Sequence, residues 1–198
     1  LFPGVKANTH FRRKEKSYAS KKKSYTRYFD SSIHDRGEIA NQRGRLGDYE
    51  GDTVYGSVGK GYLITGVDRQ SRLTVAAIAR DKTIESTNAA FIAAFRKAKL
   101  VPPITLTLDN GTEFLGFKDL EQALGTKVYF ADAHAPWQRG SNENINGLIR
   151  FFFPRGTDFT KVTDEQLDAV LELINNRPRK CLGYLSPNEF INKVLHLA

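Results

Sequence analysis

Apolar and polar residues begin to alternate at Leu46, and from there the chain reads as a series of regular elements. DYEGDTVYG alternates, while GYLITGVD and RLTVAAIA are short apolar runs, and turn residues separate the three segments. This pattern predicts three sequential strands in an antiparallel meander. ITLTL and TKVYF, further along the chain, predict two more strands.

Helical patterns alternate with these later strands. IESTNAAFIAAFRKAKL is rich in helix formers, has apolar residues at helical spacing and stops at VPP. We predict further helices in FKDLEQAL, in the polar stretch from about Ser141 to Phe152, in DEQLDAVLELINN with Thr163 as N-cap, and in SPNEFINKVLHL. An earlier segment, SSIHDRGEIANQR, favours one short helix. Three antiparallel strands followed by alternating helices and strands predict an α/β fold, with a mixed five-stranded sheet flanked by helices.

The basic residues are concentrated before this pattern begins. Residues 1–45 contain 12 Lys or Arg and 4 Asp or Glu, whereas residues 46–198 contain 18 of each, so the whole net charge of +8 lies in the first 45 residues. Such clustering predicts contact with a polyanion, most often nucleic acid, and the alternative is a solvated basic tail. We therefore divide the chain into a basic arm, 1–45, and a core, 46–198.

Cysteine content and hydropathy exclude several classes of protein. The single Cys181 rules out a disulfide framework and a cysteine metal site. No apolar run reaches the roughly 18 residues of a membrane span. Because the sequence starts at Leu1 and contains no Met, we expect it to be a fragment of a longer protein.

Four acidic side chains lie on predicted strands or directly after them. Asp48, Glu50 and Asp52 alternate in the first strand and so share one face. We expect Asp48 and Glu50 to lie on a solvated edge, and Asp52 to lie in the interior of the strand. Asp109 directly follows ITLTL, at the strand end that faces the ligand crevice in such sheets. An Asx-turn or helix cap is the alternative for Asp109. We expect Glu113 to give dipole and capping support at a helix start, and direct metal contact is the alternative.

A third acid, Glu143, lies in the polar helix. Asn142, Asn144 and Asn146 surround it, and Arg150 follows seven residues on, about two turns along the same face. An ordinary surface helix is the alternative. Asp52, Asp109 and Glu143 together have the carboxylates that a phosphoryl-transfer site needs to hold two Mg²⁺ ions roughly 3.5–4 Å apart.

Four blocks of the sequence carry a family resemblance. RLGDYEGDTVYG, TLDNGTEF, PWQRGSNENINGLIRFFFPRGTDF and NNRPRKCLGYLSPNEF resemble the insertion-sequence-thirty family of bacterial DDE transposases, over about residues 38–190. The chain departs from that family at Tyr49, where Trp is usual, and at Asp48, where His is frequent. The resemblance implies a ribonuclease-H-like integrase catalytic core. It also implies that Asp52, Asp109 and Glu143 are the catalytic residues and hold two Mg²⁺ ions, for which Mn²⁺ can substitute.

The same resemblance implies the reaction and the partners. We expect metal-dependent cleavage of transposon ends and strand transfer by 3′-hydroxyl attack on phosphodiesters, by a homodimer or higher homo-oligomer on double-stranded DNA. A ribonuclease-H-like nuclease that only hydrolyses is the alternative, and a non-enzymatic DNA-binding module is another. We expect a helix-turn-helix domain upstream, the basic arm as its connector, and a place in the bacterial cytoplasm at the nucleoid.

The candidate DNA contacts are basic or polar residues of the core and of the arm. Trp137 lies with His134 and Arg139 in the loop that enters the polar helix, a loop suited to grip DNA, and an anchor in the core is the alternative role for Trp137. The candidates in the core are His134, Arg139, Asn144, Asn146, Arg150, Arg177, Arg179 and Lys180, and those in the arm are Arg12, Arg13, Lys21, Lys22 and Lys23.

Overall fold

The five predicted strands form one mixed sheet. The computed structural model describes residues 31–133 and 135–196. The strand order is β3-β2-β1-β4-β5, so β1 lies at the centre. The meander β1-β2-β3 is antiparallel, and β4 runs parallel to both β1 and β5, which confirms the predicted topology. The strands are β1 (Asp48–Tyr55), β2 (Tyr62–Asp68), β3 (Thr74–Ala79), β4 (Thr105–Leu108) and β5 (Lys127–Phe130).

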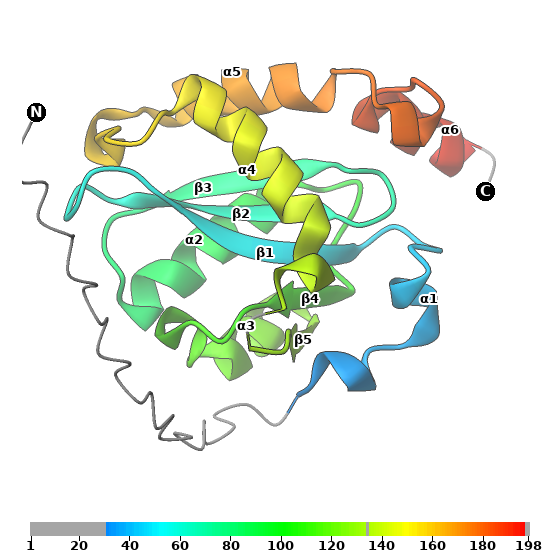
Figure 1. The fold of residues 1–198 in the computed structure, drawn as a ribbon, viewed down its shortest axis with the longest axis horizontal. Coiled ribbons are helices and arrows are strands. Elements are labelled where there is room, and N and C mark those ends of the chain that lie inside the picture. The colour runs from blue at the N-terminus through cyan, green and yellow to red at the C-terminus, as the bar shows by residue number, and fades with distance from the viewer. Residues whose placement is uncertain (1–30, 134, 197–198) are drawn as a thin grey trace, which may run out of the picture.

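Helices cover both faces of this sheet (Figure 1). The α-helices are α1 (Glu38–Asn41), α2 (Ile84–Lys97), α3 (Phe117–Leu124), α4 (Gly140–Phe152), α5 (Asp164–Asn175) and α6 (Pro187–His196). Short 3-10 helices lie at Ile33–Asp35, Thr112–Phe114, Pro136–Arg139, Phe159–Lys161 and Lys180–Leu182. The single helix predicted in SSIHDRGEIANQR is divided in two, because Arg36 adopts an extended backbone before α1 begins. Within the described ranges, no helix has the length and apolar character needed to cross a membrane.

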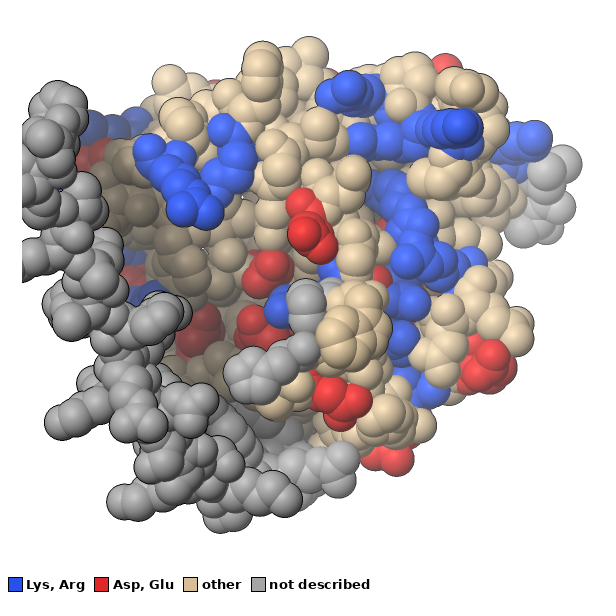
Figure 2. Space-filling model, in the orientation of Figure 1, with Lys and Arg blue, Asp and Glu red and all other residues tan. Residues whose placement is uncertain are grey.

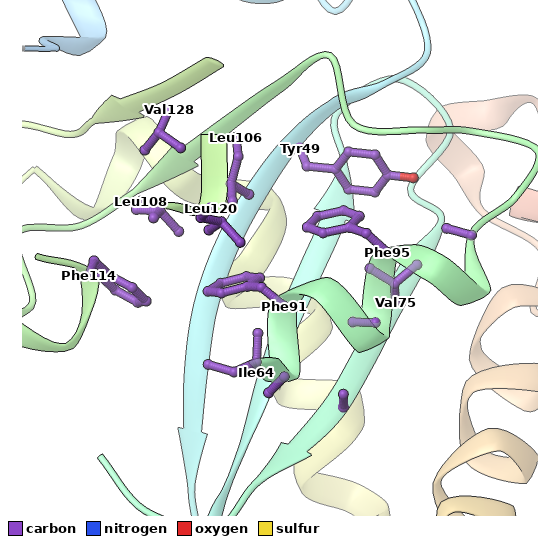
Figure 3. Close-up of a cluster of buried hydrophobic side chains, with 14 of the residues drawn as sticks. Tyr49, Ile64, Val75, Phe91, Phe95, Leu106, Leu108, Phe114, Leu120 and Val128 are labelled. Carbon is purple, nitrogen blue, oxygen red and sulfur yellow. The ribbon is translucent and has the colours of Figure 1, made fainter. Parts of the chain in front are cut away.

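One hydrophobic core fills the space between the sheet and helices α2 and α3 (Figure 3). The Tyr49 ring meets Phe95 edge-on at 4.8 Å between centroids, and its buried hydroxyl donates a hydrogen bond of 2.8 Å to the carbonyl oxygen of Val101. Gly51 lies on the same face of β1, where a Cβ would approach Leu108 Cδ2 to 2.5 Å. The missing side chain at Gly51 therefore lets the core pack directly against the centre of β1.

A second core lies on the opposite face, under α4 and α5. Val54 of β1 packs there with Ile145 and Ile149 of α4. Helix α5 begins with a capping box in which the Thr163 side chain accepts from the backbone N–H of Gln166, which confirms the predicted N-cap. Since Asp52 shares the strand face of Val54, this core positions α4 over Asp52.

The prediction of a solvated edge for Asp48 and Glu50 is wrong. Both side chains are completely buried, because β1 is the central strand and α4 covers this face. Asp48 accepts hydrogen bonds from Thr105 Oγ1 at 2.7 Å and from Arg45 Nε at 2.9 Å. A carboxylate buried at the centre of a sheet needs such partners to offset its loss of hydration.

The described end of the basic arm is packed against the sheet. Ser32 bridges to Phe130 of β5, and Arg36 Nη1 donates to Thr107 Oγ1 at 2.9 Å. Burial lowers the pKa of Arg36 to about 10, and the positive charge of Arg69 adds to that effect. Residues 31–45 are thus joined to the core by buried contacts, and the division of the chain at residue 45 stays a prediction.

Candidate active site

Asp52 and Asp109 meet at a shared cation, the guanidinium of Arg139. Asp52 lies within β1 and Asp109 directly follows β4, its parallel neighbour. Arg139 Nη1 lies 3.3 Å from Asp52 Oδ1, and Nη2 lies 3.1 Å from Asp109 Oδ2. Nη1 also donates to the carbonyl oxygen of Gly51 at 3.2 Å. The structure thus brings two of the three predicted acids together and supplies their counter-charge from the loop before α4.

Neighbouring donors fix both carboxylates. Asn146 Nδ2 of α4 donates to Asp52 Oδ2 at 2.8 Å, and the backbone N–H of Thr53 donates to Asp52 Oδ1 at 2.9 Å. The backbone N–H of Gly111 donates to Asp109 Oδ1 at 3.0 Å, as in an Asx-turn. Asp109 therefore takes part in local turn geometry and also faces Asp52.

The environment of Asp109 favours its protonated form. Burial raises the pKa of the Asp109 carboxyl above its ordinary value, and the charges of Asp52 and Glu113 add to this effect. The guanidinium of Arg139 and the N–H of Gly111 oppose it. The site is therefore a partly desolvated group of negative charges that a nearby cation stabilises.

Glu113 belongs to the same acidic neighbourhood. An ideal Cβ on Gly111 would lie 2.8 Å from Glu113 Oε2 and 3.0 Å from Asp109 Oδ1, so the glycine leaves room for both carboxylates. Glu113 Oε1 accepts a hydrogen bond of 2.7 Å from the hydroxyl of Tyr55. Glu113 lies in the first turn of the 3-10 helix Thr112–Phe114, as expected for dipole support, but this helix has no side-chain cap, so the expected capping role is wrong.

Glu143 does not join the two aspartates in this structure. It lies in the first turn of α4 with an exposed side chain, whereas Ile145 and Ile149 face the core. Within residues 31–133 and 135–196, no three His, Cys, Asp or Glu side chains are gathered closely enough to hold a metal ion. The convergence of all three predicted acids is therefore not observed here.

Glu50 anchors the start of α4, a role that the sequence did not reveal. Its buried carboxylate accepts from the backbone N–H groups of Ser141 at 2.9 Å and Asn142 at 3.3 Å. The carboxylate also forms a buried ion pair with Arg69, whose side chain is 6% exposed. A negative charge at a helix N-terminus is favourable both for the unpaired N–H groups and for the helix dipole. Glu50 thus connects the central strand to the helix that carries Glu143.

Acidic side chains lie near the centre of the face that α4 crosses, with Lys and Arg side chains on both sides (Figure 2). Arg150 is one of the predicted DNA contacts in α4. Its Nη1 is buried and has no hydrogen-bond partner within the described ranges. Burial lowers the pKa of Arg150, and the charge of Arg155 lowers it further. Arg150 is therefore a partly buried cation of α4, and its role as a DNA contact stays a prediction.

The other predicted DNA contacts differ in how far they are exposed to solvent. Arg177, Lys180 and Asn144 are exposed, and Arg179 Nη2 donates to the carbonyl oxygen of Ile174 at 3.0 Å near the end of α5. Trp137 is 76% exposed, which excludes the alternative role as a core anchor. The candidates outside the described residues are His134, Arg12, Arg13, Lys21, Lys22 and Lys23.

Comparison with known proteins identifies the kind of domain to which these residues belong. Residues 43–136 match the family described as the integrase core domain. The transposase for insertion sequence element IS4351 of Bacteroides fragilis is 38% identical over 98% of this chain and 60% of its own length. The transposase InsI for insertion sequence element IS30A of Escherichia coli (strain K12) is 40% identical over 81% of this chain and 42% of its own length.

A solved structure shares the fold. A chain of the simian T-cell lymphotropic virus intasome, determined in complex with the PP2A regulatory subunit B56 gamma, matches with a TM-score of 0.57 and 20% identity, over 72% of this chain and 53% of that chain. This likeness, together with the sheet order and the integrase core match, shows a ribonuclease-H-like fold, as predicted. The chain spans about half the length of the curated relatives that it matches. Over most of its length the chain is similar to insertion-sequence transposases of the IS30 type, and its residues 43–136 match the integrase core domain.

Proposed function

We propose that this chain is the catalytic core of a DNA transposase. It cleaves the ends of an insertion sequence and joins them to target DNA by 3′-hydroxyl attack on a phosphodiester. The observation that carries the proposal is the convergence of Asp52 and Asp109, from neighbouring parallel strands, on one cation. Relatives named as insertion-sequence transposases, similar over most of this chain, support the same reaction.

The chemistry of the donor set suits divalent metal ions, which the integrase-core family uses. Carboxylate oxygens are the ligands that Mg²⁺ and Mn²⁺ prefer, and these two carboxylates already face a positive charge. We assign Asp52 and Asp109 as holders of two Mg²⁺ ions, with Glu143 as the third ligand and Mn²⁺ as a substitute. When bound, the ions would stabilise the charge on the attacking and leaving oxygens of an in-line displacement.

The chain's own residues orient the site and the DNA. Asn146 holds one oxygen of Asp52, and Glu50 holds the start of the helix that carries Glu143. Arg150, a partly exposed cation of the same helix, would bind a DNA phosphate, a contact that gives affinity without reading sequence.

The remaining assignments concern DNA contacts and assembly. Handling two DNA ends together requires a homodimer or a larger homo-oligomer, and the DNA substrate puts the protein at the bacterial nucleoid. Exposed Arg177 and Lys180 would add phosphate contacts. The further proposed DNA contacts are His134, Arg139, Asn144, Asn146 and Arg179, and the basic residues of the arm.

A strand-transfer assay tests the proposal. A labelled transposon end is incubated with target DNA and Mg²⁺ or Mn²⁺, and cleaved and joined products are separated. We expect Asp109→Asn and Glu143→Gln to abolish both products, while Asp168→Asn, at an exposed ion pair with Lys97, leaves both at the wild-type level. Metal-dependent joining that survives in either active-site variant would contradict the assignment. Cleavage without joining by the wild-type protein would instead indicate a nuclease.

A further inference from the structure

We propose that Arg139 is a resident counter-cation of the metal site, which divalent ions must displace from Asp52 and Asp109. This inference rests on the proposed function, in which the two aspartates hold metal ions. It assigns to Arg139 a role in controlling metal occupancy before any contact with DNA.

The guanidinium bridges the two carboxylates. Nη1 lies 3.3 Å from Asp52 Oδ1 and Nη2 lies 3.1 Å from Asp109 Oδ2, so one planar group spans oxygens from two strands. The Arg139 side chain is only 15% exposed, and the carbonyl oxygen of Gly51 also accepts from Nη1 at 3.2 Å. Partial burial strengthens these charge-assisted contacts relative to an ion pair in open solvent.

The donors around the two aspartates leave no carboxylate oxygen free. Asn146 donates to Asp52 Oδ2, and Gly111 donates to Asp109 Oδ1. Arg139 contacts the remaining oxygen of each residue, and Asp52 Oδ1 also accepts from Thr53. Arg139 is thus the one of these donors that contacts both residues, and a metal ion placed between the two aspartates must approach where its guanidinium lies.

Charge determines which donor is displaced. Asn146 and the backbone N–H groups of Thr53 and Gly111 are neutral dipoles, whereas a guanidinium and a divalent ion at the same pair of carboxylates repel each other. Exchange of one cation for another also leaves the two carboxylates with a counter-charge in both states. Arg139 thus stabilises the metal-free site and opposes metal binding by the same contacts.

The position of Arg139 in the chain is suited to this exchange. It ends the 3-10 helix Pro136–Arg139 and is the N-cap residue of α4, a site where its side chain makes no capping hydrogen bond. Release of the side chain therefore breaks its contacts with Asp52, Asp109 and Gly51 without removing a helix cap. The freed guanidinium would then be available for a DNA phosphate.

Mn²⁺ binding to the purified metal-free protein, measured by calorimetry, tests the proposal. We expect Arg139→Gln to bind Mn²⁺ about tenfold more tightly than the wild type, the range expected when a competing charge-assisted hydrogen bond is lost. Arg155→Gln is the matched control, because it removes one positive charge from an exposed residue whose charge acts on Arg150. This variant should bind Mn²⁺ with the affinity of the wild type.

Thermal unfolding gives a second readout that does not depend on activity. In EDTA, Arg139→Gln should unfold at a lower temperature than the wild type, because its two carboxylates lack their cation. Saturating Mn²⁺ should raise that temperature more in the variant than in the wild type. If Arg139→Gln does not fold, Arg139→Lys replaces it, because a single ammonium does not reproduce the bidentate contact of the guanidinium. The Arg139→Lys protein should bind Mn²⁺ several-fold more tightly than the wild type.

Two results would overturn the proposal, and they are distinguishable. In the first result, Asp52→Asn and Asp109→Asn weaken Mn²⁺ binding, but Arg139→Gln or Arg139→Lys binds Mn²⁺ no more tightly than the wild type. The aspartates then hold metal and Arg139 does not compete with it. If neither aspartate variant weakens Mn²⁺ binding, the proposed metal site itself is wrong and the role of Arg139 fails with it.

Discussion

Glu50 is the buried carboxylate that fixes the start of α4, and we predict that Glu50→Gln destabilises the fold markedly. The substitution keeps the size of the side chain but removes its charge. It leaves the Arg69 guanidinium, 6% exposed, without a counter-ion. It also turns an amide NH₂ toward a site where the N–H groups of Ser141 and Asn142 require acceptors.

The magnitude follows from the burial of the pair. Removing one partner of a buried ion pair costs about 3–5 kcal/mol, and we expect the lower end because the glutamine oxygen can still accept one hydrogen bond. For a domain of this size, about 3 kcal/mol corresponds to a fall in unfolding temperature of roughly 6–12 °C. The exposed pair between Lys97 and Asp168, with side chains 43% and 50% exposed, provides the contrast. Asp168→Asn should cost less than about 1 kcal/mol.

Urea unfolding followed by far-ultraviolet circular dichroism measures both free energies. Fluorescence is a weaker reporter, because the only tryptophan in the chain, Trp137, is 76% exposed. Replacing Arg69 by Met in the Glu50→Gln background should recover part of the loss, since the unpaired charge is removed. A Glu50→Gln variant as stable as Asp168→Asn would refute the reasoning, because the buried pair would then contribute no more than an exposed one.

Four other substitutions have outcomes that urea unfolding can measure. Gly51→Ala should lower the free energy of unfolding by about 1–3 kcal/mol, because its Cβ would lie 2.5 Å from Leu108 Cδ2. Gly147→Ala in α4, where a Cβ would have nothing within 4 Å, should raise that free energy by about 0.5–1 kcal/mol. The opposite order of stability would contradict the packing. Thr163→Ala removes the cap of α5 and should cost about 1 kcal/mol, and no measurable loss would show that the capping box is dispensable. Burial raises the pKa of Asp109 above 3.8, so the folded protein holds this proton more tightly than the unfolded chain does. The stability of the metal-free protein should therefore fall as pH rises from 3.8 through the raised pKa. Asp109→Asn should flatten that part of the stability curve, and an unchanged slope would contradict the assigned pKa shift.

Local patterns were sufficient to predict the strands and most helices, one helix cap and the position of one acid of the site. Alternation and turn residues gave the order of strands and helices, and the position of Asp109 after a strand placed it at the correct edge of the sheet. Thr163 before a helical segment gave the correct cap. Each of these features depends on residues that are close together in the sequence, which is why a pattern can reveal them.

The burial of Glu50 and the role of Arg139 depend on contacts between distant segments. Glu50 is buried because β4 pairs with β1 and makes it central, a pairing across more than 50 residues that strand alternation does not encode. Arg139 reaches Asp52 only because a loop from beyond β5 returns over β1. For Glu143, helical spacing fixes the side of α4 on which it lies but not the rotamer of its side chain.

The central claim is that Asp52, Asp109 and Glu143 hold the divalent ions of a DNA strand-transfer site. A crystal structure of the protein with Mn²⁺ and a transposon-end DNA, phased on the anomalous signal of manganese, tests it most directly. We predict manganese peaks between Asp52 and Asp109, Glu143 turned toward them as a further ligand, and Arg139 withdrawn from both aspartates. Bound DNA with Arg139 still bridging the aspartates and no manganese at any of the three acids would contradict the claim.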